Sequence, residues 1–304
     1  MARRGRGRDV SGVIVLDKPA GMSSSDAVQR VKRAFNARKV GHTGSLDPLA
    51  TGVLPLCLGD ATKFSQYLLN SDKRYLAHVR LGISTNSGDA DGEVLQEREV
   101  KGIDRPHLER ALDAFRGEIE QVPSMFSAVK HHGKPLYKLA RLGIEIEREA
   151  RPVTVYQNDI VAFEGTRLSL DIHCSKGTYV RTIAHDLGEA LGCGAHVDAL
   201  RRTQAGPYGE DDLATLEDIE TARLEHRLDG LLRPVASTVG QWPEVALTGA
   251  PAFYLKQGQP VLVPHAPTTG WVRLIEGTDT EGTFIGVGEI LDDGRVAPRR
   301  LIVK

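Results

Sequence analysis

One carboxylate in this chain stands in a setting unlike an ordinary core or surface position. Asp47 lies within Gly41–Gly59, which reads GHTGSLDPLATGVLPLCLG. The glycines permit positive φ and close approach of another molecule, and Pro48 biases Asp47 toward extended geometry. An acid displayed on such a loop can act as a nucleophile, a proton acceptor or an electrostatic stabiliser. The apolar run VLPLCL that follows is typical of a buried strand.

A second interpretation of the same loop is structural. Asp followed by Pro, with Gly and Thr nearby, is a common turn composition in which Asp47 would bond its own backbone. From the loop alone, the two interpretations stay open.

A carboxylate in a closed site needs a compensating charge, because otherwise it takes up a proton. The segment KGTYVRT places Arg181 close to a turn that glycine permits, and a planar guanidinium fits a carboxylate. Arg181 is therefore our candidate partner for Asp47. The alternative is an exposed arginine at the start of a helix, since most arginines are exposed.

Fifteen consecutive residues around Asp47, GHTGSLDPLATGVLP, resemble the active-site motif of bacterial TruB-type tRNA pseudouridine synthases. The likeness covers nearly the whole chain. It includes segments similar to the family's first, tyrosine, arginine and leucine motifs, which are Val13–Arg33, Lys73–Glu93, His173–Gly188 and Gly194–Thr203. The resemblance implies an enzyme that converts uridine 55 in the T-loop of tRNA to pseudouridine, with Asp47 as a catalytic residue.

Pseudouridine formation breaks the bond from ribose C1′ to uracil N1 and remakes it to C5. No atoms enter or leave, so we expect no metal and no cofactor. The carboxylate could attack C1′ or C6, stabilise cationic character or remove a proton, and the sequence does not choose among these. The uridine must also leave its stack, which costs roughly a few kcal/mol that the pocket has to offset.

The resemblance assigns roles to other residues as well. Tyr75 matches the tyrosine that stacks on the flipped uracil and can remove the C5 proton, and Arg181 matches the partner of the aspartate. The expected substrate-binding residues are Tyr179 and Leu200 in the pocket wall, His42 in space vacated by the RNA, and Lys18 and Pro19 as positioning residues of the first motif. For Tyr75, Tyr179 and Leu200, the alternative is core packing.

Two other function classes compete with an isomerase. A non-catalytic tRNA-binding protein or RNA chaperone is disfavoured because Asp47, Tyr75 and Arg181 are all present. A carboxylate-dependent hydrolase of sugars or nucleosides would normally use a second acid in a comparable motif, and we find none.

Length and composition are consistent with two domains. The 304 residues are 40% hydrophobic, enough for at least one full core. We recognise no signal peptide and no apolar run long enough to span a bilayer, so we expect a cytoplasmic protein without membrane contact, and a monomer. Cys57, Cys174 and Cys193 are far apart and lack the spacing of a zinc site, which predicts three buried thiols.

The net charge is −1 with histidine neutral, so RNA binding depends on how charge is distributed. The segment MARRGRGR predicts a disordered basic arm over residues 1–10, which either contacts phosphates or only aids solubility. Two further basic groups are candidates for tRNA backbone contacts, with solvated surfaces as the alternative. They are Arg30, Lys32, Arg33, Arg38 and Lys39, and Lys130, Lys134, Lys138 and Arg141.

Periodicity predicts the elements that position these residues. Strands are expected over residues 12–17, 74–81, 154–163 and 167–174, and helices over residues 26–35, 61–69, 106–115 and 180–191. The acidic stretch Ser87–Glu93 is expected to be a solvated turn rather than a calcium loop. His131 and His132 are expected in an exposed loop rather than at a metal.

These elements indicate an α+β fold. Residues 11–245 are expected to form the catalytic domain, a mixed β-sheet flanked by helices and loops as in pseudouridine synthases. Beyond it, short apolar runs separated by Gly, Pro and Asp, among them FYLKQGQPVLV, predict a small all-β domain over residues 246–304. In the family, this position holds a PUA-type RNA-binding domain, and the strand-rich ending is similar to one.

Overall fold

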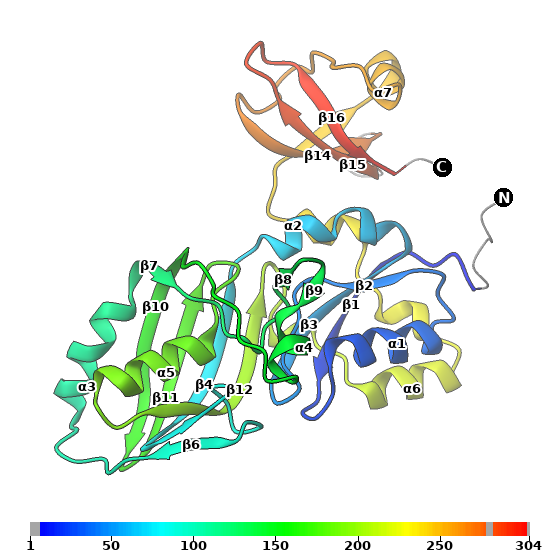
Figure 1. The fold of residues 1–304 in the computed structure, drawn as a ribbon. Helices are drawn as coiled ribbons and strands as arrows, with labels where there is room; N and C mark the ends of the chain where they lie inside the picture. The colour runs from blue at the N-terminus through cyan, green and yellow to red at the C-terminus, as the bar shows by residue number, and fades with distance from the viewer. Residues whose placement is uncertain (1–6, 278–281, 303–304) are drawn as a thin grey trace.

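The structure is a computed structural model that describes residues 7–277 and 282–302 (Figure 1). Its main feature is a mixed eight-stranded sheet with the order β1-β3-β12-β4-β11-β10-β7, in which β2 also pairs with β3. The strands are β1 Gly12–Lys18, β2 Val40–His42, β3 Thr51–Leu58, β4 Lys73–Leu81, β7 Gly117–Gln121, β10 Arg151–Glu164, β11 Arg167–Cys174 and β12 Ala195–Ala205. The fold class expected from the sequence is confirmed.

The helices and two small hairpins surround this sheet. The helices of this part are α1 Ser24–Ala34, α2 Ser65–Leu69, α3 Arg105–Leu112, α4 Leu136–Ala140, α5 Val180–Ala190 and α6 Leu216–Leu224. The hairpins pair β5 Ile83–Thr85 with β6 Val94–Glu97, and β8 Lys130–His131 with β9 Lys134–Pro135. Figure 1 shows α5 lying across the sheet beside β11 and β12, while α1 and α6 lie together at the end that carries β1.

Most predicted elements are present with small shifts at their ends. The four predicted strands are β1, β4, β10 and β11, and the predicted helices over residues 26–35 and 180–191 are α1 and α5. The alternation of apolar and polar residues predicted β11 well, because every second side chain from Leu168 to Cys174 is buried. The predicted helices over residues 61–69 and 106–115 each divide into an α-helix and a short 3-10 turn.

Strand β12 brings the two halves of the sheet together. It runs parallel to β3 and antiparallel to β4, with Arg202 opposite Gly52 on one side and Tyr75 on the other. Gly52 has φ +95°, and a Cβ placed there would lie 2.3 Å from the Arg202 carbonyl oxygen. The glycine is therefore required where the loop that carries Asp47 enters β3 so close to β12.

A second, smaller sheet follows Gly240. It has the order β13-β14-β15-β16, from strands Glu244–Leu247, Gly270–Glu276, Thr283–Ile290 and Val296–Leu301. Its buried apolar residues form a core of their own, separate from that of the large sheet. One detail of the sequence-based expectation is wrong: the run that begins FYLK lies in helix α7, Gly249–Lys256, and not in a strand.

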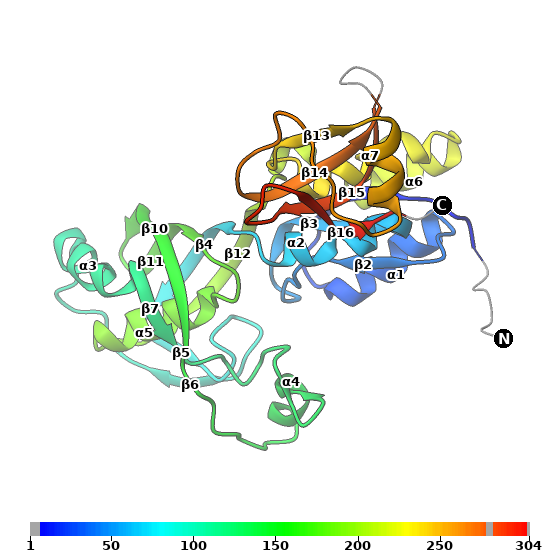
Figure 2. The same ribbon diagram turned by 90° about the horizontal axis from the view of Figure 1, so that it is seen from above.

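The two sheets meet through aromatic side chains near α2. Phe64 packs against Phe284 with ring centroids 5.3 Å apart, and Tyr67 contacts Trp242 at 4.9 Å. Trp242 in turn stacks on Trp271 at 5.3 Å. Phe64, which precedes α2, is fully buried in this contact. Figure 2 shows the small sheet lying over α2 and the β1–β3 end of the large sheet.

The basic arm expected over residues 1–10 is only partly described, because residues 1–6 lie outside the described residues. From residue 7 onward the arm is held. The amide of Arg8 donates to the carbonyl of Asn36 (2.6 Å), and its guanidinium pairs with Asp229 (2.5 Å). The expectation of disorder therefore does not hold for Arg8. Among the described helices, none has the length and apolar character needed to cross a bilayer.

Candidate active site

The loop that carries Asp47 is tied to helix α1. The hydroxyl of Ser24 accepts a hydrogen bond from the amide of Leu46 (2.7 Å) and donates one to its carbonyl (3.0 Å). Ser23, the N-cap of α1, accepts from the amide of Asp26 and so fixes the start of that helix. The buried Ser24 thus holds Leu46, the residue preceding Asp47, through both its backbone N–H and its backbone carbonyl.

Lys18 secures the other side of this loop. Its ammonium group is buried and donates to the carbonyl oxygens of Pro19 (2.8 Å), Met22 (2.7 Å) and Pro48 (3.3 Å). Burial lowers the pKa of Lys18 to about 8, while the nearby Asp47 opposes that shift. Neither Lys18 nor the exposed Pro19 lines the cavity, and the positioning role expected for them stays a prediction.

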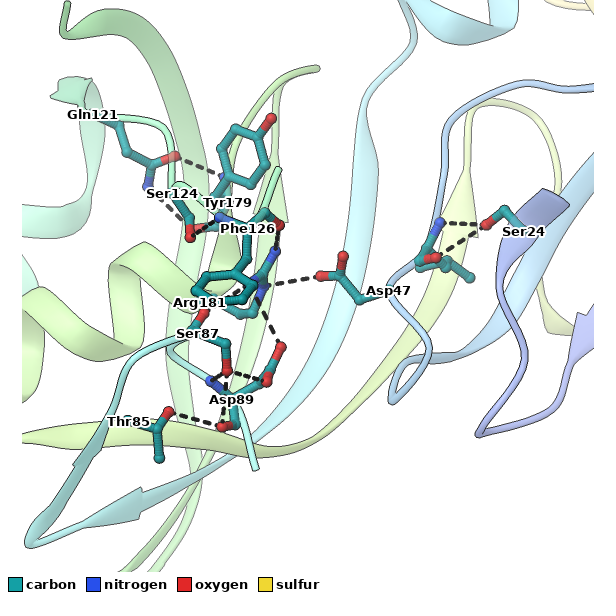
Figure 3. Close-up of polar contacts among 11 residues, drawn as sticks. Ser24, Asp47, Thr85, Ser87, Asp89, Gln121, Ser124, Phe126, Tyr179 and Arg181 are labelled. Atoms are coloured by element: carbon teal, nitrogen blue, oxygen red, sulfur yellow. Dashed lines mark hydrogen bonds and ion pairs between the residues drawn. The ribbon is translucent and has the colours of Figure 1, made fainter. Parts of the chain in front are cut away.

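Arg181 lies in the first turn of α5 and reaches Asp47. Its Nε is 2.9 Å from Asp47 Oδ2, while Nη1 donates to the carbonyl of Ser87 (2.7 Å) and Nη2 to that of Phe126 (2.8 Å). Only 5% of the Arg181 side chain is exposed, so the alternative of a surface arginine is excluded. Figure 3 shows the guanidinium between Asp47 on one side and Asp89 on the other.

The carboxyl group of Asp47 faces a cavity rather than bulk water. Its side chain is 40% exposed, yet the surrounding walls desolvate it, and this burial raises its pKa above the ordinary value for aspartate. The charge of Arg181 lowers the pKa again, and that of Asp89 raises it. Arg181 therefore favours the charged form of Asp47 against the effect of burial.

Asp89 is a site residue that the sequence analysis missed. The turn Ser87–Glu93 was expected to be solvated, but Asp89 is only 5% exposed and its Oδ2 lies 3.5 Å from Arg181 Nη1. The hydroxyl of Ser87 donates to its Oδ1 (2.5 Å), and that of Thr85 donates to its carbonyl (2.8 Å). The Ser87 side chain, two residues before the acid, was the available signal, because a serine hydroxyl can satisfy a buried carboxylate.

Asp89→Asn is expected to slow the uridine isomerisation that the family resemblance implies by about ten- to a hundred-fold, because Arg181 loses one of the two carboxylates that orient it. Since the charge of Asp89 raises the pKa of Asp47, the acid limb of the rate profile should move to lower pH. Single-turnover rates between pH 5 and 8 measure both effects. Glu97→Gln, which changes an exposed acid on β6 that does not line the cavity, is the control. A limb that moves to higher pH would contradict this account.

Five of the sequence-predicted residues meet Asp47 around one cavity of about 1180 Å³. They are His42 from β2, Tyr75 from β4, Leu200 from β12, and Tyr179 and Arg181 at the start of α5. Tyr75 and Leu200 also pack against the main hydrophobic core. These two residues therefore line the cavity and contribute to core packing at the same time. Burial raises the pKa of Tyr75 above that of an ordinary phenol and lowers that of His42.

Tyr179 is placed by a residue that the sequence analysis did not single out. The side-chain carbonyl of Gln121 accepts from the amide of Tyr179 (2.7 Å), and its amide nitrogen donates to the Tyr179 carbonyl (3.1 Å). Gln121 is buried at the end of β7, and Tyr179 is the N-cap of α5. This two-point contact orients the start of α5 and with it Arg181.

The segment between β7 and β10, residues 122–150, forms another wall. Lys130, Tyr137 and Arg141 from this segment line the cavity, so part of the second basic group lies at the site. His131 and His132 lie in or beside the β8–β9 hairpin. Across residues 7–277 and 282–302, no cluster of three or more His, Cys, Asp or Glu side chains is arranged to hold a metal ion.

Three family models match consecutive parts of the chain. The TruB family pseudouridylate synthase N-terminal domain matches residues 32–180, and the tRNA pseudouridylate synthase B C-terminal domain matches residues 181–240. A third model, pseudouridine synthase II TruB, C-terminal, matches residues 243–302.

Curated relatives are similar over nearly their whole length. The tRNA pseudouridine synthase B of Yersinia enterocolitica is 57% identical over 310 residues, covering 99% of this chain and 93% of that protein. The protein of the same name from Serratia proteamaculans is also 57% identical, covering 99% and 98%. The one from Tolumonas auensis is 55% identical over 309 residues, covering 99% and 94%.

Solved structures with the same fold are chains from multi-component complexes. A chain in the crystal structure of a Cbf5–Nop10–Gar1 complex is 27% identical, with a TM-score of 0.73 that covers 96% of this chain and 84% of that chain. A chain of an H/ACA ribonucleoprotein bound to a substrate RNA reaches the same TM-score at 23% identity, which shows the fold alone. The full-length relatives and the three matching models together establish that this chain belongs to the TruB family of pseudouridine synthases.

Proposed function

We propose that this protein isomerises uridine to pseudouridine at position 55 in the T-loop of tRNA. The observation that carries the proposal is the Asp47–Arg181 ion pair, 2.9 Å long, at the wall of a cavity that is also lined by Tyr75, Tyr179 and Leu200. Membership of the TruB family and relatives named tRNA pseudouridine synthase B support the same reaction. The arrangement also favours an enzyme over a non-catalytic RNA-binding protein, because binding alone does not require a desolvated acid fixed by a buried arginine.

The proposed reaction conserves every heavy atom of the nucleotide. The C1′–N1 bond breaks, the uracil turns within the pocket, a C1′–C5 bond forms, and the proton at C5 leaves while N1 gains one. Asp47 acts at C1′ of the ribose or at C6 of the base, and Arg181 keeps it charged until the base has been placed. Tyr75 and Leu200 provide the aromatic and apolar walls against which a flipped base can stack, which offsets the cost of unstacking.

The basic side chains around the cavity support binding of the RNA backbone. Lys130 and Arg141 line the cavity, while Arg30 and Arg33 line surface hollows along α1, one of which shares Asp26 with the cavity. Phosphate contacts of this kind supply affinity without reading sequence. We propose that His42, on the cavity wall, occupies the space that the flipped nucleotides leave. Because the proposed substrate is tRNA, we further propose that the enzyme works in the cytoplasm. We also propose that it is a monomer.

An unmodified tRNA transcript tests the proposal directly. Incubation with the purified protein should convert uridine 55, which chemical mapping of pseudouridine by primer extension would locate. A transcript with cytidine at that position is the matched control and should bind without conversion. Binding of both transcripts with no pseudouridine in either would overturn the proposed reaction and favour the RNA chaperone instead.

The segment after Gly240 is proposed to bind RNA without taking part in the chemistry. Its strand β13 begins at Glu244 and pairs with β14, so we place the division between the domains before Glu244. None of the residues around Asp47 comes from this segment.

Truncation after Gly240 is expected to raise KM for tRNA and reduce the salt dependence of binding, because phosphate contacts are removed. Single-turnover chemistry at saturating RNA should stay within a few-fold of the full chain. The truncate loses the partners of Phe64 and Tyr67, so a second truncate with Phe64→Ser and Tyr67→Lys serves as the soluble control. Circular dichroism checks that each is folded. A folded truncate that binds tRNA normally but cannot convert it would contradict the proposed division of roles.

A further inference from the structure

Arg202 on β12 is a buried cation without an acidic partner among residues 7–277 and 282–302. It is 1% exposed and is one of the largest fully buried side chains of the protein. Its guanidinium donates hydrogen bonds to backbone carbonyl oxygens, whereas the neighbouring Arg201 pairs with Asp17 and Glu210. Burying a charge in this way costs free energy, so a guanidinium at this place indicates a specific role.

One of the two carbonyl groups that Arg202 bonds precedes Asp47 in the chain, and the other follows it. Nε donates to the carbonyl of Val53 (2.7 Å), and Nη2 donates to that of Gly44 (3.1 Å). Gly44 lies in the loop before Asp47, and Val53 follows it on β3. A Cβ placed at Gly44, where φ is +125°, would lie 3.7 Å from Arg202 Nη1, so this part of the loop lies against the guanidinium. One planar group therefore holds both ends of the loop together.

The same residue borders the expected uracil pocket. Arg202 lies directly opposite Tyr75 in the antiparallel pairing of β12 and β4, and Leu200 lies opposite Ala77. Residues opposite one another in such a pair project from the same face of the sheet, so the side chains of Arg202 and Tyr75 are neighbours. Tyr75 and Leu200 both line the cavity around Asp47. The guanidinium thus connects the loop that carries the acid to the strand that carries the tyrosine.

The charge of Arg202 also shifts the pKa values of titratable groups around it. Burial is the main cause of the raised pKa of Tyr75, and the positive charge of Arg202 opposes that rise. Burial likewise lowers the pKa of His42, and Arg202 lowers it further. The guanidinium lies close enough to the cavity to influence its titratable side chains, which agrees with the contacts described above.

We infer that Arg202 is a positioning residue for this reaction, which holds the Asp47 loop closed and fixes its place relative to Tyr75. The inference rests on the proposed function, since that function defines the chemistry that is being positioned. A lysine keeps the charge but cannot donate in a planar fork to two carbonyl groups. A displacement of the reacting group by about 1 Å can cost on the order of a hundred-fold in rate.

Arg202→Lys tests the inference, with Arg201→Lys as the matched control one residue away. Arg201 carries its charge on the other face of β12, where 33% of its side chain is exposed. Single-turnover rate constants, measured with enzyme in excess and RNA saturated, do not depend on the fraction of enzyme that is folded. We expect R202K to be slower by about ten- to a hundred-fold with tRNA affinity within about three-fold of the unmodified protein. R201K should stay within about two-fold on both measures.

Three results would overturn the inference. One is R202K with a rate constant within two-fold of the unmodified enzyme, and another is a loss of affinity without a loss of rate. If R202K does not fold, R202Q, whose amide nitrogen corresponds to the Nε that donates to Val53, is measured in its place. Failure of both to fold while R201K folds would show that Arg202 maintains the fold rather than the position of the loop. These results differ from failure of the proposed function, in which the unmodified enzyme itself would form no pseudouridine.

Discussion

Asp47→Asn is expected to abolish pseudouridine formation while leaving tRNA affinity within about an order of magnitude. The substitution preserves the shape of the side chain and removes its charge and its nucleophilic oxygen. Losing an essential catalytic group of this kind typically costs several orders of magnitude in rate. Phosphate contacts from other residues supply most of the affinity, so binding should survive.

The measurement pairs a tritium-release or chemical mapping assay with a filter-binding titration on the same preparation. Residual turnover above about one percent of the unmodified enzyme would exclude Asp47 as the essential group. The structure strengthens the expectation about binding, because Leu46 and Pro48 are held through their backbone by Ser24 and Lys18. The loop should therefore keep its position when the carboxylate becomes an amide.

Local patterns in the sequence were sufficient to predict the elements whose faces are clearly divided. Strand β11 buries every second side chain and helix α5 buries one face, so alternation and helical spacing found both. Helix α7 was missed because its sequence, GAPAFYLK, contains a proline and a run of large apolar residues typical of strands. Proline is tolerated in the first turn of a helix, where its missing N–H has no intrahelical partner.

The site residues that were missed depend on contacts between distant segments. Asp89 belongs to an acidic, glycine-containing turn, and such turns are usually solvated. It is buried because Arg181, far along the chain, packs over it. Gln121 and Arg202 gave no local signal either, since their partners are backbone groups of α5 and of the Asp47 loop. Family resemblance named six residues that the structure gathers around one cavity, but it did not reveal what holds them in place.

Replacement of Arg181 is the second substitution with a large expected effect. Arg181→Met should lose nearly all activity, because Asp47 and Asp89 are left in the cleft without their shared cation. An isolated buried acid takes up a proton at a higher pH than usual. Since the charge of Arg181 lowers the pKa of Asp47 in the intact protein, its loss should move the acid limb of any residual rate to higher pH. The single-turnover rate between pH 5 and 9 measures this shift.

Arg181→Lys should recover little of the lost rate, and the reason lies in the number of contacts. The guanidinium reaches Asp47 through Nε, Asp89 and the Ser87 carbonyl through Nη1, and the Phe126 carbonyl through Nη2. A single ammonium group cannot reach all of these from one place, so we expect a rate at least about a hundred-fold below that of the unmodified enzyme.

Arg98→Met, which removes an exposed pair with Glu189 near the end of α5, is the control for losing an arginine beside that helix. It should keep both the rate and the pH profile, because an exposed ion pair contributes little. If Arg181→Lys matched it in rate, positive charge alone would account for the role of Arg181. The planar contacts of the guanidinium with Asp47, Asp89 and the backbone of residues 87 and 126 would then be structural and not needed for the reaction. The two carboxylates would need only a cation nearby.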